Sequence, residues 1–188
     1  MATANDNRDA LVDYWIGNSK IEYTNSSDPI TLGPETITVK ENRIIKTSKD
    51  LTINANIVYD NDVRYDSVSQ IPKLIISANN ITISCNVSMI DAILIAKNNI
   101  NTCNSYGSGE EQANEAERNN QLRIRGAVIA NSLTPSRTHG AGIEGESAIP
   151  AEIINYDSSV MLWAQYMAGN DDSAALTVTY QRELAPRY

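Results

Sequence analysis

The chain has 188 residues, of which 41% are hydrophobic, and a formal net charge of -8 at pH 7. This length suits one domain, or one domain with a small cap. The acidic balance excludes nucleic acid and anionic lipid as expected partners, because both need a concentrated basic face. No apolar run approaches the roughly 18 residues of a membrane-spanning helix, so we expect no direct membrane insertion by this sequence.

Residues 1–20 are predicted to form an N-terminal helical cap. Leu11, Val12, Trp15 and Ile16 fall at helical spacing, and Gly17 follows where a helix would stop. The first residues lack the charged and apolar regions of a signal peptide. The protein is therefore either cytosolic or the trimmed part of an exported protein.

Residues 21–150 contain a repeated unit in which a polar pair precedes a short apolar strand. Asparagine pairs of this kind are Asn79 and Asn80, Asn98 and Asn99, and Asn119 and Asn120, and a related copy begins at Lys49 and Asp50. Asparagine tolerates left-handed backbone conformations and bonds its own backbone, so each pair is predicted to form a corner. Short apolar strands between such corners are typical of a chain that winds, and further short strands separated by polar or glycine corners are predicted at 86–88, 122–124 and 126–130. The sequence predicts a mainly β fold, a right-handed parallel β-helix or solenoid, with insertions at 59–70 and 104–120.

The two cysteines of the chain, Cys85 and Cys103, each close a strand of this repeat. If the two strands are neighbours, their backbones lie about 4.8 Å apart, which permits a disulfide. The alternative is two buried thiols that act as small hydrophobic residues. A disulfide would persist only in an oxidising compartment, and we therefore favour an extracellular or cell-surface location.

Residues 151–188 are predicted to form a C-terminal cap that consists of a helix and a strand. Val160, Trp163, Ala164 and Met167 recur at helical spacing, and Gly169 follows them. The range 175–180 alternates as a strand does.

No residue is predicted to be catalytic, and no cofactor is expected. His139 is the one histidine, so the common zinc and iron triads are excluded by number. A weak calcium site is the exception that remains open, because hard oxygen ligands at short spacing suit this ion. Its candidate ligands are Asp60, Asp62 and Asp66. The alternative is a solvated acidic loop.

An ordered set of short motifs runs from Asp91 to the end of the chain. It comprises Asp91-Ala92-Ile93-Leu94-Ile95-Ala96, Ile100-Asn101-Thr102-Cys103, Asn120-Gln121-Leu122, Gly126-Ala127-Val128-Ile129-Ala130-Asn131, Arg137-Thr138, Pro150-Ala151-Glu152-Ile153, Leu162-Trp163 and Arg182-Glu183-Leu184-Ala185-Pro186-Arg187-Tyr188. This set resembles the C-terminal region of β-helical surface proteins of candidate-phyla bacteria, which are ultrasmall and live attached to other microbes. The resemblance implies a secreted or membrane-tethered β-helical protein and implies no activity. In that group the cysteine after Ile-Asn-Thr pairs with one beyond the variable loop; here no cysteine follows the loop, which leaves Cys85 as the available partner.

These observations favour a non-enzymatic extracellular module for adhesion, display or appendage assembly. Its expected partner is an unknown surface ligand, either a glycan or a protein. One alternative is a polysaccharide-active enzyme that uses carboxylates of the insertions. Another is a scaffold that self-associates through its exposed ends.

Overall fold

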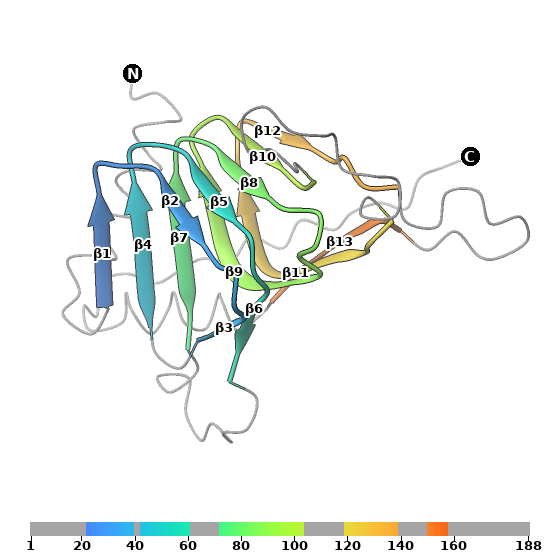
Figure 1. The fold of residues 1–188 in the computed structure, drawn as a ribbon, viewed down its shortest axis with the longest axis horizontal. Helices are drawn as coiled ribbons and strands as arrows, with labels where there is room; N and C mark the ends of the chain where they lie inside the picture. The colour runs from blue at the N-terminus through green and yellow to red at the C-terminus, as the bar shows by residue number, and fades with distance from the viewer. Residues whose placement is uncertain (1–21, 40–41, 61–71, 104–118, 139–149, 158–188) are drawn as a thin grey trace, which may run out of the picture.

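The computed structural model describes residues 22–39, 42–60, 72–103, 119–138 and 150–157. Within these ranges the chain forms strands and no helix (Figure 1). Consequently, none of the described ranges contains a helix that is long and apolar enough to cross a membrane. The predicted N-terminal cap of residues 1–20 and the C-terminal helix and strand lie outside the described residues.

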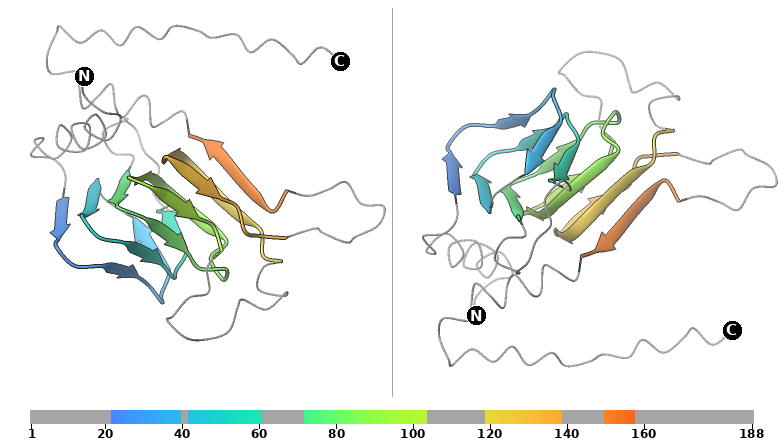
Figure 2. Two further views of the ribbon diagram at one scale, coloured as in Figure 1. Left: turned by 90° about the horizontal axis from the view of Figure 1, so that it is seen from above. Right: turned by 90° about the horizontal axis from the view of Figure 1, so that it is seen from below.

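The strands belong to two sheets, and every pairing is parallel. The larger, eight-stranded sheet runs in the order β1 (Glu22–Ser26), β4 (Arg43–Thr47), β7 (Leu74–Ala78), β9 (Met89–Ala96), β11 (Leu122–Ile129) and β13 (Glu152–Tyr156), with β3 (Ile37–Val39) and β6 (Ile57–Tyr59) joined to it through β9. The smaller, five-stranded sheet runs in the order β12 (Ser132–Thr134), β10 (Asn99–Asn101), β8 (Ile81–Ile83), β5 (Leu51–Ile53) and β2 (Ile30–Leu32). In both sheets the order follows the chain from one end to the other, as the colours show (Figure 2).

The prediction of a mainly β chain with parallel strands is confirmed. The sheets themselves are not the predicted solenoid, because a regular solenoid keeps one sheet for each face. Here β9 and β11 each continue for eight residues without a corner. As a result β9 pairs with β6, β7 and β11 and joins their strands in one sheet.

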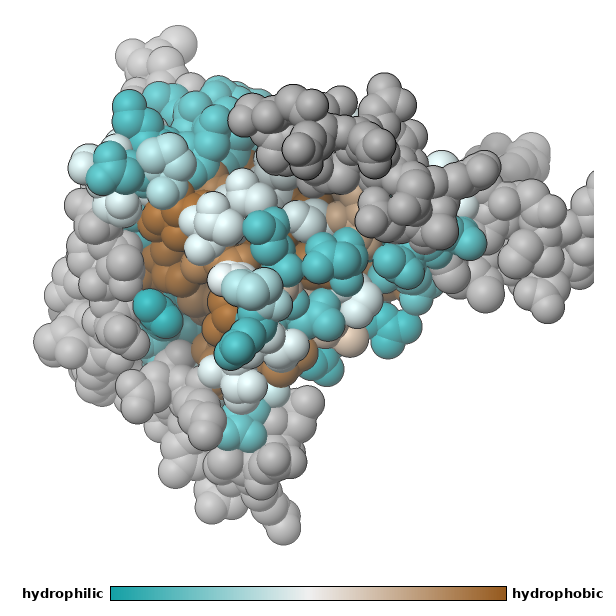
Figure 3. Space-filling view, viewed as in Figure 1, coloured by the Kyte–Doolittle hydropathy of each residue, from teal (hydrophilic) through white to brown (hydrophobic). Residues whose placement is uncertain are grey.

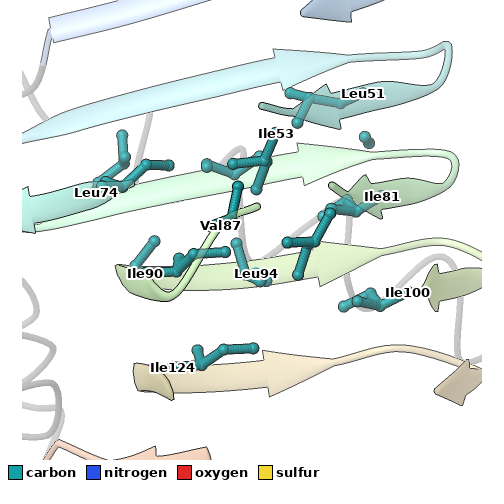
Figure 4. Close-up of a cluster of buried hydrophobic side chains, with 14 of the residues drawn as sticks. Leu51, Ile53, Leu74, Ile81, Val87, Ile90, Leu94, Ile100 and Ile124 are labelled. Carbon is teal, nitrogen blue, oxygen red and sulfur yellow. The ribbon is translucent and has the colours of Figure 1, made fainter. Parts of the chain in front are cut away.

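The core lies between the two sheets and consists of rows of aliphatic side chains in register (Figure 4). The row in the larger sheet is Ile37, Ile57, Ile90, Ile124 and Ile154. The row in the smaller sheet is Ile30, Leu51, Ile81, Ile100 and Leu133. The middle members are fully buried, whereas Ile154 and Leu133 at the last strands are 44% and 40% exposed. Each buried aliphatic side chain contributes about 2 kcal/mol of transfer free energy, so these rows hold the layers together.

The polar pairs that precede the strands form stacked corners in the smaller sheet. The Asn80 amide donates to the Asp50 carboxylate at 2.8 Å, and the Asn98 amide donates to Asn79 Oδ1 at 2.9 Å. Short polar side chains bonded across neighbouring strands fix the register of the sheet. The Asn119 and Asn120 copy is different, because it leads into β11 of the larger sheet.

Two local strand predictions were wrong. The expected strand at 86–88 is absent, since the Val87 amide donates to the Ser84 carbonyl at 3.1 Å and the chain turns there. The two strands expected at 122–124 and 126–130 are one strand, β11. Gly126 does not form a corner; it has φ of 150° inside the strand. Glycine adopts this angle without steric cost, and the strand continues through it.

Candidate functional site

The disulfide that the sequence permitted is present between Cys85 and Cys103. Cys85 follows β8 and Cys103 follows β10, which are neighbouring parallel strands. Their Cα atoms are 4.4 Å apart, and both residues are buried. The alternative of two free buried thiols is therefore wrong.

The buried guanidinium of Arg137 lies beside the disulfide and donates to backbone carbonyls on both sides of it. Its hydrogen bonds reach Thr102 O at 2.8 Å, Asn120 O at 3.0 Å, Ser84 O at 3.0 Å and Cys85 O at 3.2 Å. Burial lowers the pKa of Arg137 to about 10, and the nearby Glu152 carboxylate acts in the opposite direction. The planar five-donor fork of arginine suits four carbonyls that approach from different directions.

Glu152, the first residue of β13, completes this arrangement. Its Oε1 accepts from the Thr102 hydroxyl at 2.7 Å, from the Arg137 amide at 3.1 Å and from the Ser136 amide at 3.2 Å. We call the set of Cys85, Cys103, Thr102, Arg137 and Glu152 the cystine clamp. Charge-assisted hydrogen bonds of this kind are stronger than neutral ones.

The cystine clamp lies where two chain segments leave the sheets. The segment 104–118 begins directly after Cys103 and ends two residues before Asn120, whose carbonyl accepts a hydrogen bond from Arg137. The segment 139–149 begins two residues after Arg137 and ends three residues before Glu152. Described residues close to both ends of each segment therefore belong to, or bind to, one network.

Replacing Cys85 and Cys103 together by alanine is expected to lower the free energy of unfolding by about 3 kcal/mol. The physical reason is that the bond closes a separation of 18 residues and restricts the unfolded chain. Urea unfolding measures the change. A reducing agent should destabilise the wild type by a similar amount and leave the double variant unaffected; equal effects on both proteins would contradict the prediction.

A second network of ionisable side chains is built on β9 and β11. Asp91 in β9 is fully buried. Its carboxylate accepts hydrogen bonds from Nε of Arg125 in β11, at 2.6 Å, and from a terminal nitrogen of the same side chain. It also accepts the Tyr59 amide at 2.9 Å. The hydrogen bond to Asp91 raises the pKa of Arg125. A carboxylate with three donors is satisfied in its charged form, which a buried acid needs.

Lys73 and Asp157 extend this network toward the surface. The Lys73 ammonium is 3.0 Å from Asp157 Oδ2 and lies 4.7 Å from the centre of the Tyr59 ring. The Lys73 side chain is fully buried, whereas that of Asp157 is 28% exposed. We call Tyr59, Lys73, Asp91, Arg125 and Asp157 the ionic clamp. It includes described residues on both sides of the segment 61–71, because Tyr59 precedes that segment and Lys73 follows it.

Burial raises the pKa of the Tyr59 hydroxyl, more than its proximity to the Leu74 backbone lowers it. This hydroxyl makes no hydrogen bond of ordinary geometry in the described ranges. Replacing Tyr59 by phenylalanine is therefore expected to change the free energy of unfolding by less than about 1 kcal/mol at pH 7.

At alkaline pH the stability of the wild type and that of Tyr59→Phe should diverge. The tyrosine loses its proton more readily in the unfolded chain, with a pKa near 10.0, than in the native one. Its contribution to stability is complete below pH 10 and is lost as the pH rises above that value. Urea titrations at pH 7 and above pH 10 should show the wild type losing more stability than Tyr59→Phe. Parallel pH curves would contradict this expectation.

The outward face of the smaller sheet is polar. Its strands align Thr31, Thr52, Thr82, Asn101 and Thr134 in one row, one residue for each strand. Figure 3 shows hydrophilic and near-neutral side chains where this sheet faces the viewer. Neighbouring strands lie about 4.8 Å apart, so the row has a regular spacing.

The predicted calcium site lies largely outside the described residues, since Asp62 and Asp66 fall in 61–71. Asp60 is described and follows β6. In the part of the chain that the structure describes, no three His, Cys, Asp or Glu residues are grouped as metal ligands.

The two cysteines were predicted from the sequence, whereas Arg137, Glu152 and Lys73 were not predicted to belong to a site. A buried role for Arg137 leaves no local signal, because its partners come from four separate segments. Comparison with protein-family models, with curated proteins and with solved structures finds no match for this chain.

Proposed function

We propose that the protein is a non-enzymatic extracellular module that displays its inserted segments for adhesion. The observation that carries this proposal is that described residues close to both ends of the segments 61–71, 104–118 and 139–149 belong to, or bind to, the two clamps. Segments 104–118 and 139–149 share the cystine clamp, and segment 61–71 begins and ends at the ionic clamp. Binding residues on loops are effective when a rigid scaffold holds the loop ends.

The energetic cost of these networks supports the same interpretation. Buried charges such as Arg137, Lys73 and Asp91 require compensation that an aliphatic core would not need. A core needed only for stability is served as well by isoleucine rows. Charged networks beside these segments instead fix the positions of the residues that flank each segment.

The disulfide supports an exported location, because such bonds persist in oxidising compartments. The strand order supports a rigid body in which successive strands are added to two parallel sheets from one end to the other. The proposed ligand is a glycan or a protein on a cell surface.

The test replaces segments 104–118 and 139–149, separately and together, by short Gly-Ser linkers. We expect thermal unfolding to change little, because loop length has a weak effect on closure entropy. Binding to a glycan array and to purified cell envelopes should be lost in the double replacement. A replacement of the exposed Arg123 by methionine serves as the matched surface control. Binding that survives removal of both segments, or a wild type that binds no array component and no envelope, would refute the proposal.

A second candidate function, self-assembly, is favoured by a groove at the end of the sheets. This groove has a volume of about 670 Å³. Its lining includes Gly126, Val128, Ala130, Leu133, Ile154 and Tyr156. Leu133, Ile154 and Tyr156 are 40%, 44% and 58% exposed, and exposed apolar patches often mark interaction sites.

Light scattering across a concentration series tests this candidate. Self-assembly predicts a molar mass that rises with concentration and a loss of that rise in Leu133→Asp. A monomer at every concentration would eliminate it.

A further inference from the structure

Lys73 and Asp157 are a lysine and an aspartate held in contact although 84 residues separate them. The Lys73 ammonium is 3.0 Å from Asp157 Oδ2. The lysine side chain has no exposed surface, whereas the aspartate side chain is 28% exposed. The lysine end of the pair is therefore shielded from water, and the aspartate end is partly open to it.

Backbone hydrogen bonds fix both residues. The Lys73 amide donates to Asn42 Oδ1 at 3.0 Å, and the Lys73 carbonyl accepts from the Arg43 amide at 2.8 Å. The Asp157 amide donates to the Gly126 carbonyl at 3.3 Å. Two reactive groups held at contact distance by a folded scaffold behave as if at very high concentration.

The surroundings disfavour the charged pair relative to an uncharged product. Removing an ammonium ion and a carboxylate from water is costly, and only part of this cost returns as mutual attraction. The second carboxylate of the ionic clamp, that of Asp91, already accepts hydrogen bonds from Arg125 and from the Tyr59 amide. An amide between Lys73 and Asp157 would remove both charges and keep the two segments joined.

We propose that Lys73 and Asp157 form an intramolecular isopeptide bond. The lysine Nζ attacks Cγ of Asp157, the Nζ–Cγ bond forms and one Cγ–O bond breaks. Starting from the ammonium and carboxylate, the departing oxygen takes two of the three ammonium protons and leaves as water. One proton stays on the amide nitrogen, so the step needs no oxidant and no second substrate. The exposed side of Asp157 gives the water a path to solvent.

Intact-mass measurement of the full chain under denaturing and reducing conditions tests the bond. The wild type should be lighter than its sequence by one water molecule. Fragment spectra should join the peptide that contains Lys73 to the peptide that contains Asp157. A full sequence mass, or a water loss confined to one peptide, would overturn the proposal.

Three variants sharpen the test. Lys73→Arg and Asp157→Ala should both have the full mass of their sequences. Asp157→Asn offers an amide that can react with loss of ammonia instead of water, and its bonded product is chemically identical to that of the wild type. We therefore expect Asp157→Asn to converge on the wild-type mass. Since the wild-type measurement decides the question alone, a variant that fails to fold leaves the test intact.

Discussion

Replacing Arg137 by methionine is expected to lower the free energy of unfolding by about 3–5 kcal/mol. Methionine keeps much of the volume but donates no hydrogen bond. The substitution leaves the carbonyls of Ser84, Cys85, Thr102 and Asn120 without the guanidinium that they share. It also leaves Glu152 without the charge that faces it.

Two controls accompany this variant in urea unfolding. Arg123→Met removes the same charge from an exposed position of β11 and should change stability by no more than about 0.5 kcal/mol. Arg137→Lys keeps the charge, but a single nitrogen cannot serve carbonyls in four directions, so it should restore only part of the loss. A cost below about 1 kcal/mol for Arg137→Met would mean that the cystine clamp contributes little.

Replacing Gly126 by alanine is also expected to lower the free energy of unfolding substantially, by about 3–5 kcal/mol. Gly126 pairs with Ala92 of β9 and has φ of 150°. A Cβ atom at this position would lie 2.1 Å from the Ala92 carbonyl oxygen. Strands β9 and β11 would have to move apart at this position, which lies beside the ion pair of Asp91 and Arg125 and beside the hydrophobic core.

Ala127→Ser is the matched control, because Ala127 is the next residue of β11 and is half-buried. It should unfold within about 1 kcal/mol of the wild type. Thermal unfolding of the two variants measures the contrast. A Gly126→Ala protein as stable as the control would contradict the close approach of β9 and β11.

The parts of the fold that the sequence predicts are those determined by neighbouring residues. The strands at Leu51–Ile53 and Ile81–Ile83 follow their polar corners as expected. The disulfide was also predictable, because each cysteine closes a strand of the repeat and the two strands are neighbours. In these cases the spacing of apolar and polar residues contains the information.

Long-range features were not predictable in this way. The two strands expected around Gly126 merge because the positive φ fits a close pairing with Ala92, and no local pattern reveals that partner. The Asn119 and Asn120 copy precedes a strand of the larger sheet, whereas Ser132–Thr134 is the segment that pairs with β10. The clamps combine residues as far apart as Lys73 and Asp157, which only the folded chain brings together.

Native-state hydrogen exchange at the ends of the insertions tests the account most directly. The amides of Ser136 and Arg137 donate to Glu152, and the amide of Tyr59 donates to Asp91. If the clamps hold these ends rigidly, the three amides should exchange only through global unfolding, with the same free energy as the core strands. Fast exchange of these amides through local opening, while β8 and β9 remain protected, would contradict the account.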